Sequence, residues 1–166
     1  TYDHRYVFDE IGYNLKPLDL QAAIGLQQIQ KLPRLDAARR KNFQRLSKIF
    51  EPYSEYFYLP EATEKADPCW FAYLLTVKEN APFNRGDIVN YLENAKIQTR
   101  SYFSGNILAH PGYYHMAEQY EDLHEAFPIA SLVTTNSFFL GTYLGLTEEK
   151  MNYIKKTLDG FFESIK

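Results

Sequence analysis

Polar side chains stand at the ends of predicted elements, where binding sites are commonly built. Arg100 and Ser101 end a predicted strand, and Asn106 and His110 follow in a segment rich in turn formers. Two of these residues have simple structural interpretations. Asn106 tolerates a left-handed turn conformation, and Arg100 can form a surface ion pair that contributes little to stability. The pattern alone therefore marks candidate site residues without assigning them a reaction.

Another polar residue, Asn14, lies between Tyr13 and Leu15, directly before a predicted helix. Pro17 suits the first position of that helix, because the N–H that proline lacks would be unpaired there anyway. Asn14 can serve simply as a turn or cap residue. The stretch GYNLKP, residues 12–17, is nevertheless an unusual way to lead into a helix.

Familiar catalytic motifs are absent from the sequence. The histidines at positions 4, 110, 115 and 124 show no paired metal-ligand spacing, and no GxSxG, P-loop or GxGxxG is present. The single cysteine, Cys69, lies in an apolar stretch without activating neighbours, so we interpret it as a buried hydrophobic residue. One cysteine excludes a disulfide framework and a Cys-rich metal site within this chain. It also favours a reducing, cytoplasmic location.

Bulk composition narrows the function classes. The 166 residues fit one domain and carry a net charge of -3, with no stripe of Lys and Arg for nucleic acid. No apolar run is long enough to span a bilayer, and no signal peptide is visible. Tyr and Phe are abundant, 14 and 12 residues, which fits either a filled core or a large interface or sugar-lined cleft.

Periodicity predicts a mixed helix and sheet domain. Apolar spacing indicates helices over residues 17–32 and 35–50, with Pro33 breaking or kinking the chain between them. We expect a third helix after Asn84 as its cap and a last helix after Thr147. Strands are expected over residues 69–77, 97–103 and 131–141. This order predicts an α+β fold in which helices cover one face of a short sheet.

Three blocks of the sequence, taken in order, resemble one enzyme family. Residues 2–32 resemble the segment that opens the C-terminal part of the DegT/DnrJ/EryC1/StrS family, with GYNLKP where the usual motif is close to GYNYRM. The blocks RSYFSGNILAHPGY, residues 100–113, and TNSFFLGTYLGLTEE, residues 135–149, are similar to one branch. That branch comprises the CDP-4-keto-6-deoxyglucose 3-dehydrases of lipopolysaccharide biosynthesis.

The resemblance implies a fold and a division of the chain. The family consists of sugar-nucleotide enzymes that use pyridoxal or pyridoxamine phosphate on the type I aminotransferase fold. This chain would be its small C-terminal domain, with residues 1–16 as an interface segment from a large domain and residues 17–166 as the small domain. We expect residues 2–15 to be mobile or rearranged without that large domain.

The resemblance also implies roles for the candidate residues. Asn14 would contact the cofactor phosphate of the neighbouring subunit of a homodimer, and Lys16 would offer the same phosphate a point charge. Arg100 would pair with the nucleotide diphosphate. Ser101, Asn106 and His110 would face the substrate beside it. Relatives often carry Arg-Gln where this chain has Ala109-His110, which leaves the nucleotide and sugar open.

The implied activity belongs to a longer parent protein. In this family the base, Lys in aminotransferases and His in 3-dehydrases, lies upstream of the matched segment, as do the iron–sulfur cysteines of the dehydrase branch. Cys69 matches none of those cysteines. We therefore expect a cytoplasmic 3-dehydrase of CDP-linked sugars in the parent and no turnover by this chain alone. The alternatives are a sugar-nucleotide aminotransferase and a non-catalytic binding or assembly module.

Overall fold

The fold is built on a four-stranded antiparallel sheet, and helices pack against it, as the sequence predicts. The computed structural model describes residues 13, 15–102 and 105–165. The strands are β1 (Phe57–Tyr58), β2 (Ala72–Val77), β3 (Arg100–Ser101) and β4 (Ser137–Gly141), in the order β1-β2-β4-β3. Each neighbouring pair is antiparallel. The predicted α+β class, a short sheet with helices, is confirmed.

The first helix is longer than predicted. Helix α1 runs from Asp19 to Phe50 without interruption and contains Pro33, so the expected break there is wrong. Proline removes one intrahelical hydrogen bond, but residues 29–33 are exposed, so water can hydrate the freed carbonyl. The chain still divides into two units at this proline, residues 1–33 and 34–166. The expected division after residue 16 stays a prediction.

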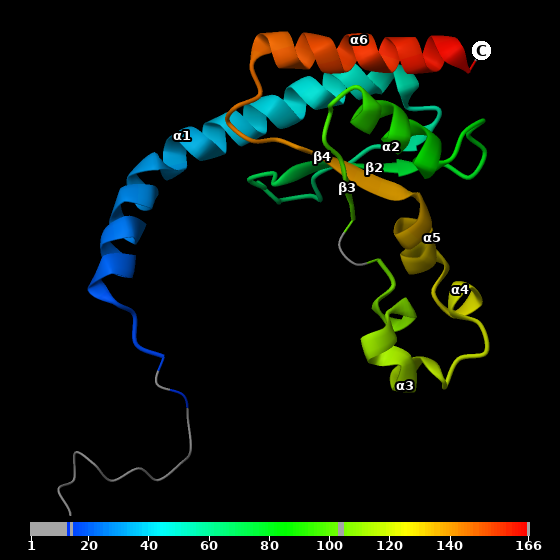
Figure 1. Cartoon of the computed structure of the whole chain (residues 1–166), viewed down its shortest axis with the longest axis horizontal. Coiled ribbons are helices and arrows are strands. Elements are labelled where there is room, and N and C mark those ends of the chain that lie inside the picture. The colour runs from blue at the N-terminus through cyan, green and yellow to red at the C-terminus, as the bar shows by residue number, and fades with distance from the viewer. Residues whose placement is uncertain (1–12, 14, 103–104, 166) are drawn as a thin grey trace, which may run out of the picture. The chain divides into compact units, whose positions relative to one another are not determined.

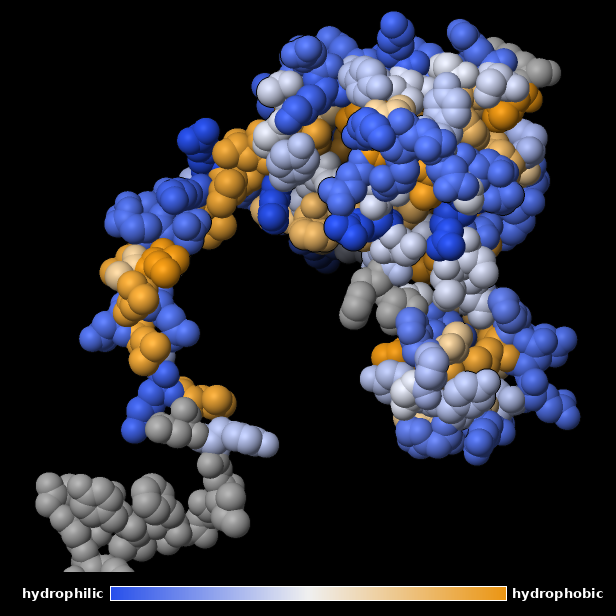
Figure 2. All heavy atoms as spheres, in the orientation of Figure 1, coloured by the Kyte–Doolittle hydropathy of each residue, from blue (hydrophilic) through white to orange (hydrophobic). Residues whose placement is uncertain are grey.

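The first half of α1 exposes apolar side chains. Figure 2 shows a run of hydrophobic side chains along this part of the helix, and Leu20, Ile24 and Ile29 are each more than half exposed. The predicted apolar face, Leu18, Ala22, Gly25, Ile29 and Leu32, is exposed throughout. None of the described helices is both long and apolar enough to cross a membrane.

The core of residues 34–166 lies between the sheet and three helices. The second half of α1 runs beside α6 (Glu148–Ser164) over one face of the sheet (Figure 1), and Arg45 forms an ion pair with Glu148 between them. Helix α2 (Arg85–Asn94) completes this layer. The predicted caps Asn84 and Thr147 are confirmed. The largest fully buried side chains of the core include Leu46, Phe50, Phe57, Tyr73, Leu75, Ile88, Leu92, Phe138, Met151 and Leu158.

All three predicted strands are shorter than expected. Residues 131–136 belong to helix α5 (Pro128–Asn136) rather than to a strand. Thr134 and Thr135 donate side-chain hydrogen bonds to carbonyls one turn earlier. Their hydroxyls are therefore hydrogen-bonded within the helix itself. The strand predicted over residues 97–103 is reduced to β3, because the Ile97 N–H closes the end of α2 by donating to Leu92.

The connection between β3 and α5 contains short helical turns. These are η3 (Ile107–Ala109), η4 (Pro111–Tyr113), α3 (Tyr114–Ala117) and α4 (Leu123–Ala126), where a loop is predicted over most of the segment. A further turn, η2 (Glu51–Tyr53), follows α1. Cys69 precedes β2 and is exposed, so its prediction as a buried strand residue is wrong. The strand begins only at Ala72, too late to bury it.

Candidate substrate-binding groove

Arg100 lies on the edge strand of the sheet. Within β3 it pairs with Phe139 of β4, and its neighbour Ser101 pairs with Phe138. Both Arg100 and Ser101 are exposed, Ser101 is not among the residues that line the groove described below, and the predicted contact of each with substrate stays a prediction. The Arg100 side chain makes no hydrogen bond to the described residues. The positive charge of its guanidinium interacts electrostatically with the Glu93 carboxylate. Arg100 is therefore a cation available to a ligand at the sheet edge.

Glu93 is already held by its own hydrogen bonds. Its Oε1 accepts from the Thr99 backbone N–H at 2.5 Å and from the Thr99 hydroxyl at 2.8 Å. These bonds, with the positive charge of Arg100, lower the pKa of Glu93. The carboxylate therefore stays ionised, and it is not among the residues that line the groove beside Arg100.

A groove of about 500 Å³ runs beside Arg100, between the sheet edge and the start of α6. Three cations, Lys96, Arg100 and Lys150, line it, and no described lining residue is acidic. Its apolar floor comes from the sheet and α6. The remaining lining residues are Ile97, Gln98, Phe139, Leu140, Gly141, Tyr143, Leu146, Tyr153 and Ile154. An apolar cleft with a few convergent cations suits a phosphorylated ligand.

The side of the groove nearest α6 is ordered by local bonds. Lys150 donates from Nζ to the Gly145 carbonyl at 2.9 Å, and its Nζ lies 5.8 Å from the centroid of the Tyr143 ring. The Tyr153 hydroxyl donates to the Ala95 carbonyl at 3.0 Å. Lys150 is therefore held in place, while the exposed Tyr143 ring can contact an organic ligand.

Asn106 has a structural place in the fold. It is buried, and its Oδ1 accepts from the Leu108 N–H at 3.2 Å, which caps η3. Its own N–H donates to the Thr134 hydroxyl at 2.6 Å. Gly105, just before it, has φ 64° and lies against Thr134. Asn106 therefore anchors the segment that follows β3 to α5, and its predicted contact with substrate stays a prediction.

His110 separates two helical turns and is exposed. Its N–H donates to the Ile107 carbonyl at 3.1 Å, and its carbonyl accepts from the Tyr113 N–H at 2.9 Å. It is not among the lining residues of the groove at Arg100. Its substrate role stays a prediction.

The two predicted cofactor contacts belong to the first unit of the chain. Lys16 is exposed and makes no hydrogen bond or ion pair with the described residues. Asn14, and nearly all of the segment 2–15 expected to be mobile, lie outside the described residues. The described residues contain no cluster of three or more His, Cys, Asp and Glu that can hold a metal ion.

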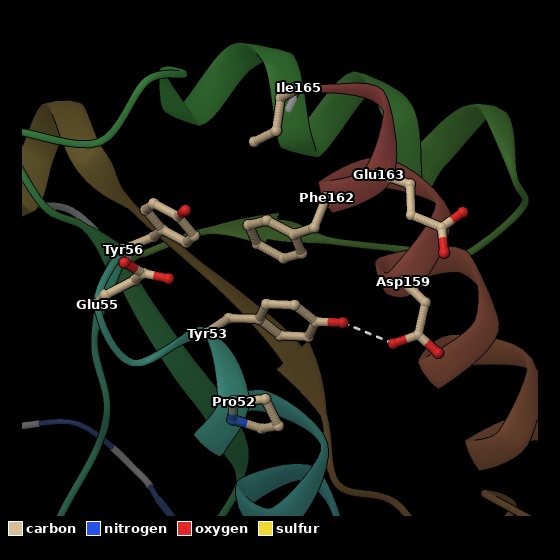
Figure 3. A pocket seen from close by; sticks show the side chains of 8 residues that line it. All are labelled: Pro52, Tyr53, Glu55, Tyr56, Asp159, Phe162, Glu163 and Ile165. Atoms are coloured by element: carbon tan, nitrogen blue, oxygen red, sulfur yellow. Dashed lines mark hydrogen bonds between the residues drawn. The ribbon is translucent and has the colours of Figure 1, made fainter.

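A second pocket lies between η2 and the end of α6, and its chemistry is different. Figure 3 shows the ring of Tyr53 lying against one face of the Phe162 ring, with Tyr56 beside them. The Tyr53 and Phe162 rings are stacked, with their centroids 3.9 Å apart. Three carboxylates surround them, from Glu55, Asp159 and Glu163. Because none of the described residues that line this pocket is a cation and its rings are stacked on one another, we interpret it as a stabilising contact.

Bonding within that pocket shifts two pKa values. The Tyr53 hydroxyl donates to Asp159 at 2.6 Å, and burial together with this carboxylate raises the pKa of Tyr53 to about 12. Lys155 and Tyr53 lower the pKa of Asp159. The pair ties η2, the turn that follows α1, to α6.

Sequence reasoning missed Lys96, Lys150 and Tyr143. Lys96 and Tyr143 follow the ends of predicted elements, and Lys150 lies in the first turn of the predicted last helix. Nothing in their spacing indicates that they share one groove with Arg100. Tyr143 does lie within the block of residues 135–149 that resembles the 3-dehydrase branch. Only the pairing of β3 with β4, 39 residues apart at Arg100 and Phe139, brings the segments together.

Comparisons with known proteins agree with one another. The sequence profile of the DegT/DnrJ/EryC1/StrS aminotransferase family matches residues 1–159. The lipopolysaccharide biosynthesis protein RfbH of Salmonella typhimurium is 38% identical over 97% of this chain and 36% of its own length. The dTDP-4-dehydro-2,6-dideoxy-D-glucose 3-dehydratase of Saccharopolyspora spinosa is 38% identical over 96% of this chain and 34% of its own length.

Two further relatives are a perosamine synthase and a 3-dehydratase of known structure. The GDP-perosamine synthase of Vibrio cholerae is 27% identical over 97% of this chain and 42% of its own length. The structure of E. coli GDP-4-keto-6-deoxy-D-mannose-3-dehydratase with bound hydrated PLP has a TM-score of 0.77 and 26% identity, covering 93% of this chain and 38% of that one. The expected aminotransferase-type fold is confirmed. The chain spans less than half the length of these relatives.

Proposed function

Because this chain belongs to the DegT/DnrJ/EryC1/StrS aminotransferase family, we propose that it is part of a sugar-nucleotide 3-dehydratase. The enzyme removes the C3 hydroxyl of a nucleotide-linked 4-keto-6-deoxyhexose during deoxysugar and O-antigen synthesis. The observation that carries the proposal is the 38% identity, over nearly the whole chain, with a named 3-dehydratase and with a lipopolysaccharide biosynthesis protein.

The proposed cofactor is pyridoxal or pyridoxamine 5′-phosphate, which supplies the electron sink for this chemistry when bound. The part of the fit that this structure can test is Lys16. Its exposed ammonium makes no ion pair with the described residues, so it is free to donate to a phosphate oxygen. Asn14, two residues earlier, would add a side-chain amide donor.

The chain's own contribution to the reaction is binding and orientation. The Arg100 fork would hold the diphosphate of the substrate in two parallel hydrogen bonds. Because the sugar is bonded directly to this diphosphate, anchoring the diphosphate would limit where C3 can lie relative to the reacting groups. Following the family resemblance, we assign the role of the base to a residue outside these 166 residues.

The finer features of the proposal follow the branch that the sequence resembles. We propose a CDP-linked substrate, a homodimeric enzyme and a cytoplasmic location. The single cysteine cannot hold a cluster that needs several thiolate ligands. The ligands of the iron–sulfur cluster expected in this branch would therefore lie outside these 166 residues.

A sugar-nucleotide aminotransferase is the second candidate. It is favoured by the GDP-perosamine synthase relative, which matches 97% of this chain. That relative is 27% identical, against 38% for the 3-dehydratase from Saccharopolyspora spinosa. We therefore place it second.

A substrate panel tests the nucleotide and the reaction class together. The full-length protein, loaded with pyridoxamine phosphate, is given CDP-, dTDP- and GDP-linked 4-keto-6-deoxyhexoses in separate reactions. We expect the CDP sugar to be consumed fastest. Faster consumption of another nucleotide overturns the CDP assignment, and consumption of none of the three overturns the proposed function.

A further inference from the structure

Lys96 occupies a backbone position that usually belongs to glycine. Helix α2 ends in a Schellman motif: the Lys96 N–H donates to the Glu93 carbonyl and the Ile97 N–H donates to the Leu92 carbonyl, both at 2.9 Å. Lys96 is the residue just beyond the cap Ala95 and has φ 62°. Glycine dominates at this position because a Cβ there meets the backbone.

A lysine in this conformation calls for a physical reason. Its side chain is exposed and forms no hydrogen bond or ion pair with any described residue, so packing does not explain it. Its charge gains something from the negative end of the α2 macrodipole. Backbone strain at a residue that lines a cleft is also a recognised mark of a binding function.

The groove beside Lys96 supplies the second observation. Lys96 lines it from the segment between α2 and β3, Arg100 lines it from β3, and Lys150 lines it from the first turn of α6. Lys150 already donates to Gly145, whereas Lys96 and Arg100 have no hydrogen-bond acceptor among the described residues. The Glu93 carboxylate, whose charge interacts with that of Arg100, accepts two hydrogen bonds from Thr99 and is not among the lining residues.

We propose that Lys96 is a phosphate-binding residue, and that with Arg100 it clamps a diphosphate group in this groove. Lys150 adds positive charge beside them, and the exposed Tyr143 ring offers a surface to the organic part of the ligand. The inference rests on the proposed function in one respect, namely that the diphosphate belongs to the nucleotide sugar. Lysine rather than glycine is present at position 96 because its ammonium binds the ligand.

A pair of matched substitutions separates this role from helix capping. Lys65 is the other described non-glycine residue with positive φ, at 66°, and it is exposed and lies outside the groove. Lys96→Gly and Lys65→Gly therefore remove the same charge and the same kind of strain. Binding of inorganic pyrophosphate, CDP and cytidine to the full-length protein is measured by calorimetry, with the melting temperature of each variant.

The account expects Lys96→Gly to weaken pyrophosphate and CDP binding by roughly tenfold, the loss of one charge-assisted contact. Cytidine binding and the melting temperature should not fall, and Lys65→Gly should bind all three probes as the unaltered protein does. Unchanged pyrophosphate and CDP binding in Lys96→Gly overturns the proposal, as does an equal loss in Lys65→Gly. Because binding is measured without turnover, its result is independent of whether the proposed reaction is correct.

Discussion

Arg100 lies directly opposite Phe139 in the antiparallel pair of β3 and β4, at the edge of the sheet. The pairing is only two residues long, so the Arg100 backbone is fixed while the chain on either side leaves the sheet. Side chains opposite one another in such a pair share a face of the sheet. Arg100 and Phe139 accordingly both line the groove, which Lys96 and Lys150 also line.

Replacing Arg100 should weaken substrate binding more than it alters the chemical step. In the full-length protein, Arg100→Ala removes the fork from the diphosphate, and we expect KM to rise about 10- to 100-fold, since each tenfold corresponds to about 1.4 kcal/mol. Arg100→Lys should recover only part of this loss, because an ammonium cannot make two parallel bonds. Steady-state kinetics measure both.

The control for this series is Lys156→Ala, which removes an exposed cation from α6 outside the groove. It should leave KM unchanged. If Arg100→Ala lowered kcat without raising KM, the binding role assigned to Arg100 would be wrong.

Alkaline unfolding should depend on Tyr53. Its pKa is raised from 10.0 to about 12 in the folded protein, so its contribution to stability is complete below pH 10 and is lost as the pH rises through about 12. Asp159 has a lowered pKa, so its contribution is lost instead as the pH falls. Urea denaturation from pH 7 to 11.5 should show the alkaline loss in the unaltered protein.

Tyr53→Phe serves as the test of that assignment. It keeps the ring stacked on Phe162 and removes only the hydroxyl that donates to Asp159. We expect a cost of about 1 kcal/mol at pH 7 and a smaller decline in stability above pH 10. Parallel curves for the two proteins across the alkaline range would contradict the assignment.

Gly105 should tolerate no side chain. Its φ is 64°, and an added Cβ would lie 2.7 Å from the Thr134 Cα, closer than such atoms approach. Gly105→Ala should destabilise the protein by about 2 kcal/mol or more and disturb the Asn106 anchor. Gly112→Ala is the matched control, because an added Cβ there meets nothing within 4 Å. Thermal melts that fall equally for both would refute this explanation.

Local signals predicted some elements well. Asn84 and Asp87 predict the start of α2. The structure confirms it with a capping box, in which the side chain of each accepts from the backbone N–H of the other. The apolar residues Met151, Ile154 and Leu158 predict the buried face of α6. These features depend on residues within one or two turns of each other, so a single sequence contains them.

Other elements depend on partners that local patterns do not include. Residues 131–136 carry β-branched residues typical of a strand, but the bonds of Thr134 and Thr135 back to the preceding turn fit them to a helix. Pro33 is a helix breaker by propensity, yet α1 continues through it. In both places the surroundings outweigh the propensity of the individual residue.

The candidate site shows the same division. Arg100 could be found because it ends a predicted strand and lies in a block that resembles a known family. Lys96 could not, because its positive φ and its place in the groove appear only once α2, β3 and α6 are assembled. Asn106 was selected for its polarity, and the structure adds its hydrogen bonds to Leu108 and Thr134.

The most direct test of the proposed function is the composition of the product sugar. The full-length protein, loaded with pyridoxamine phosphate, is incubated with a CDP-linked 4-keto-6-deoxyhexose, and the product is analysed by mass spectrometry. The account predicts a sugar that has lost its C3 hydroxyl and carries no nitrogen. A product that keeps the C3 hydroxyl and carries an amino group would contradict it and identify an aminotransferase.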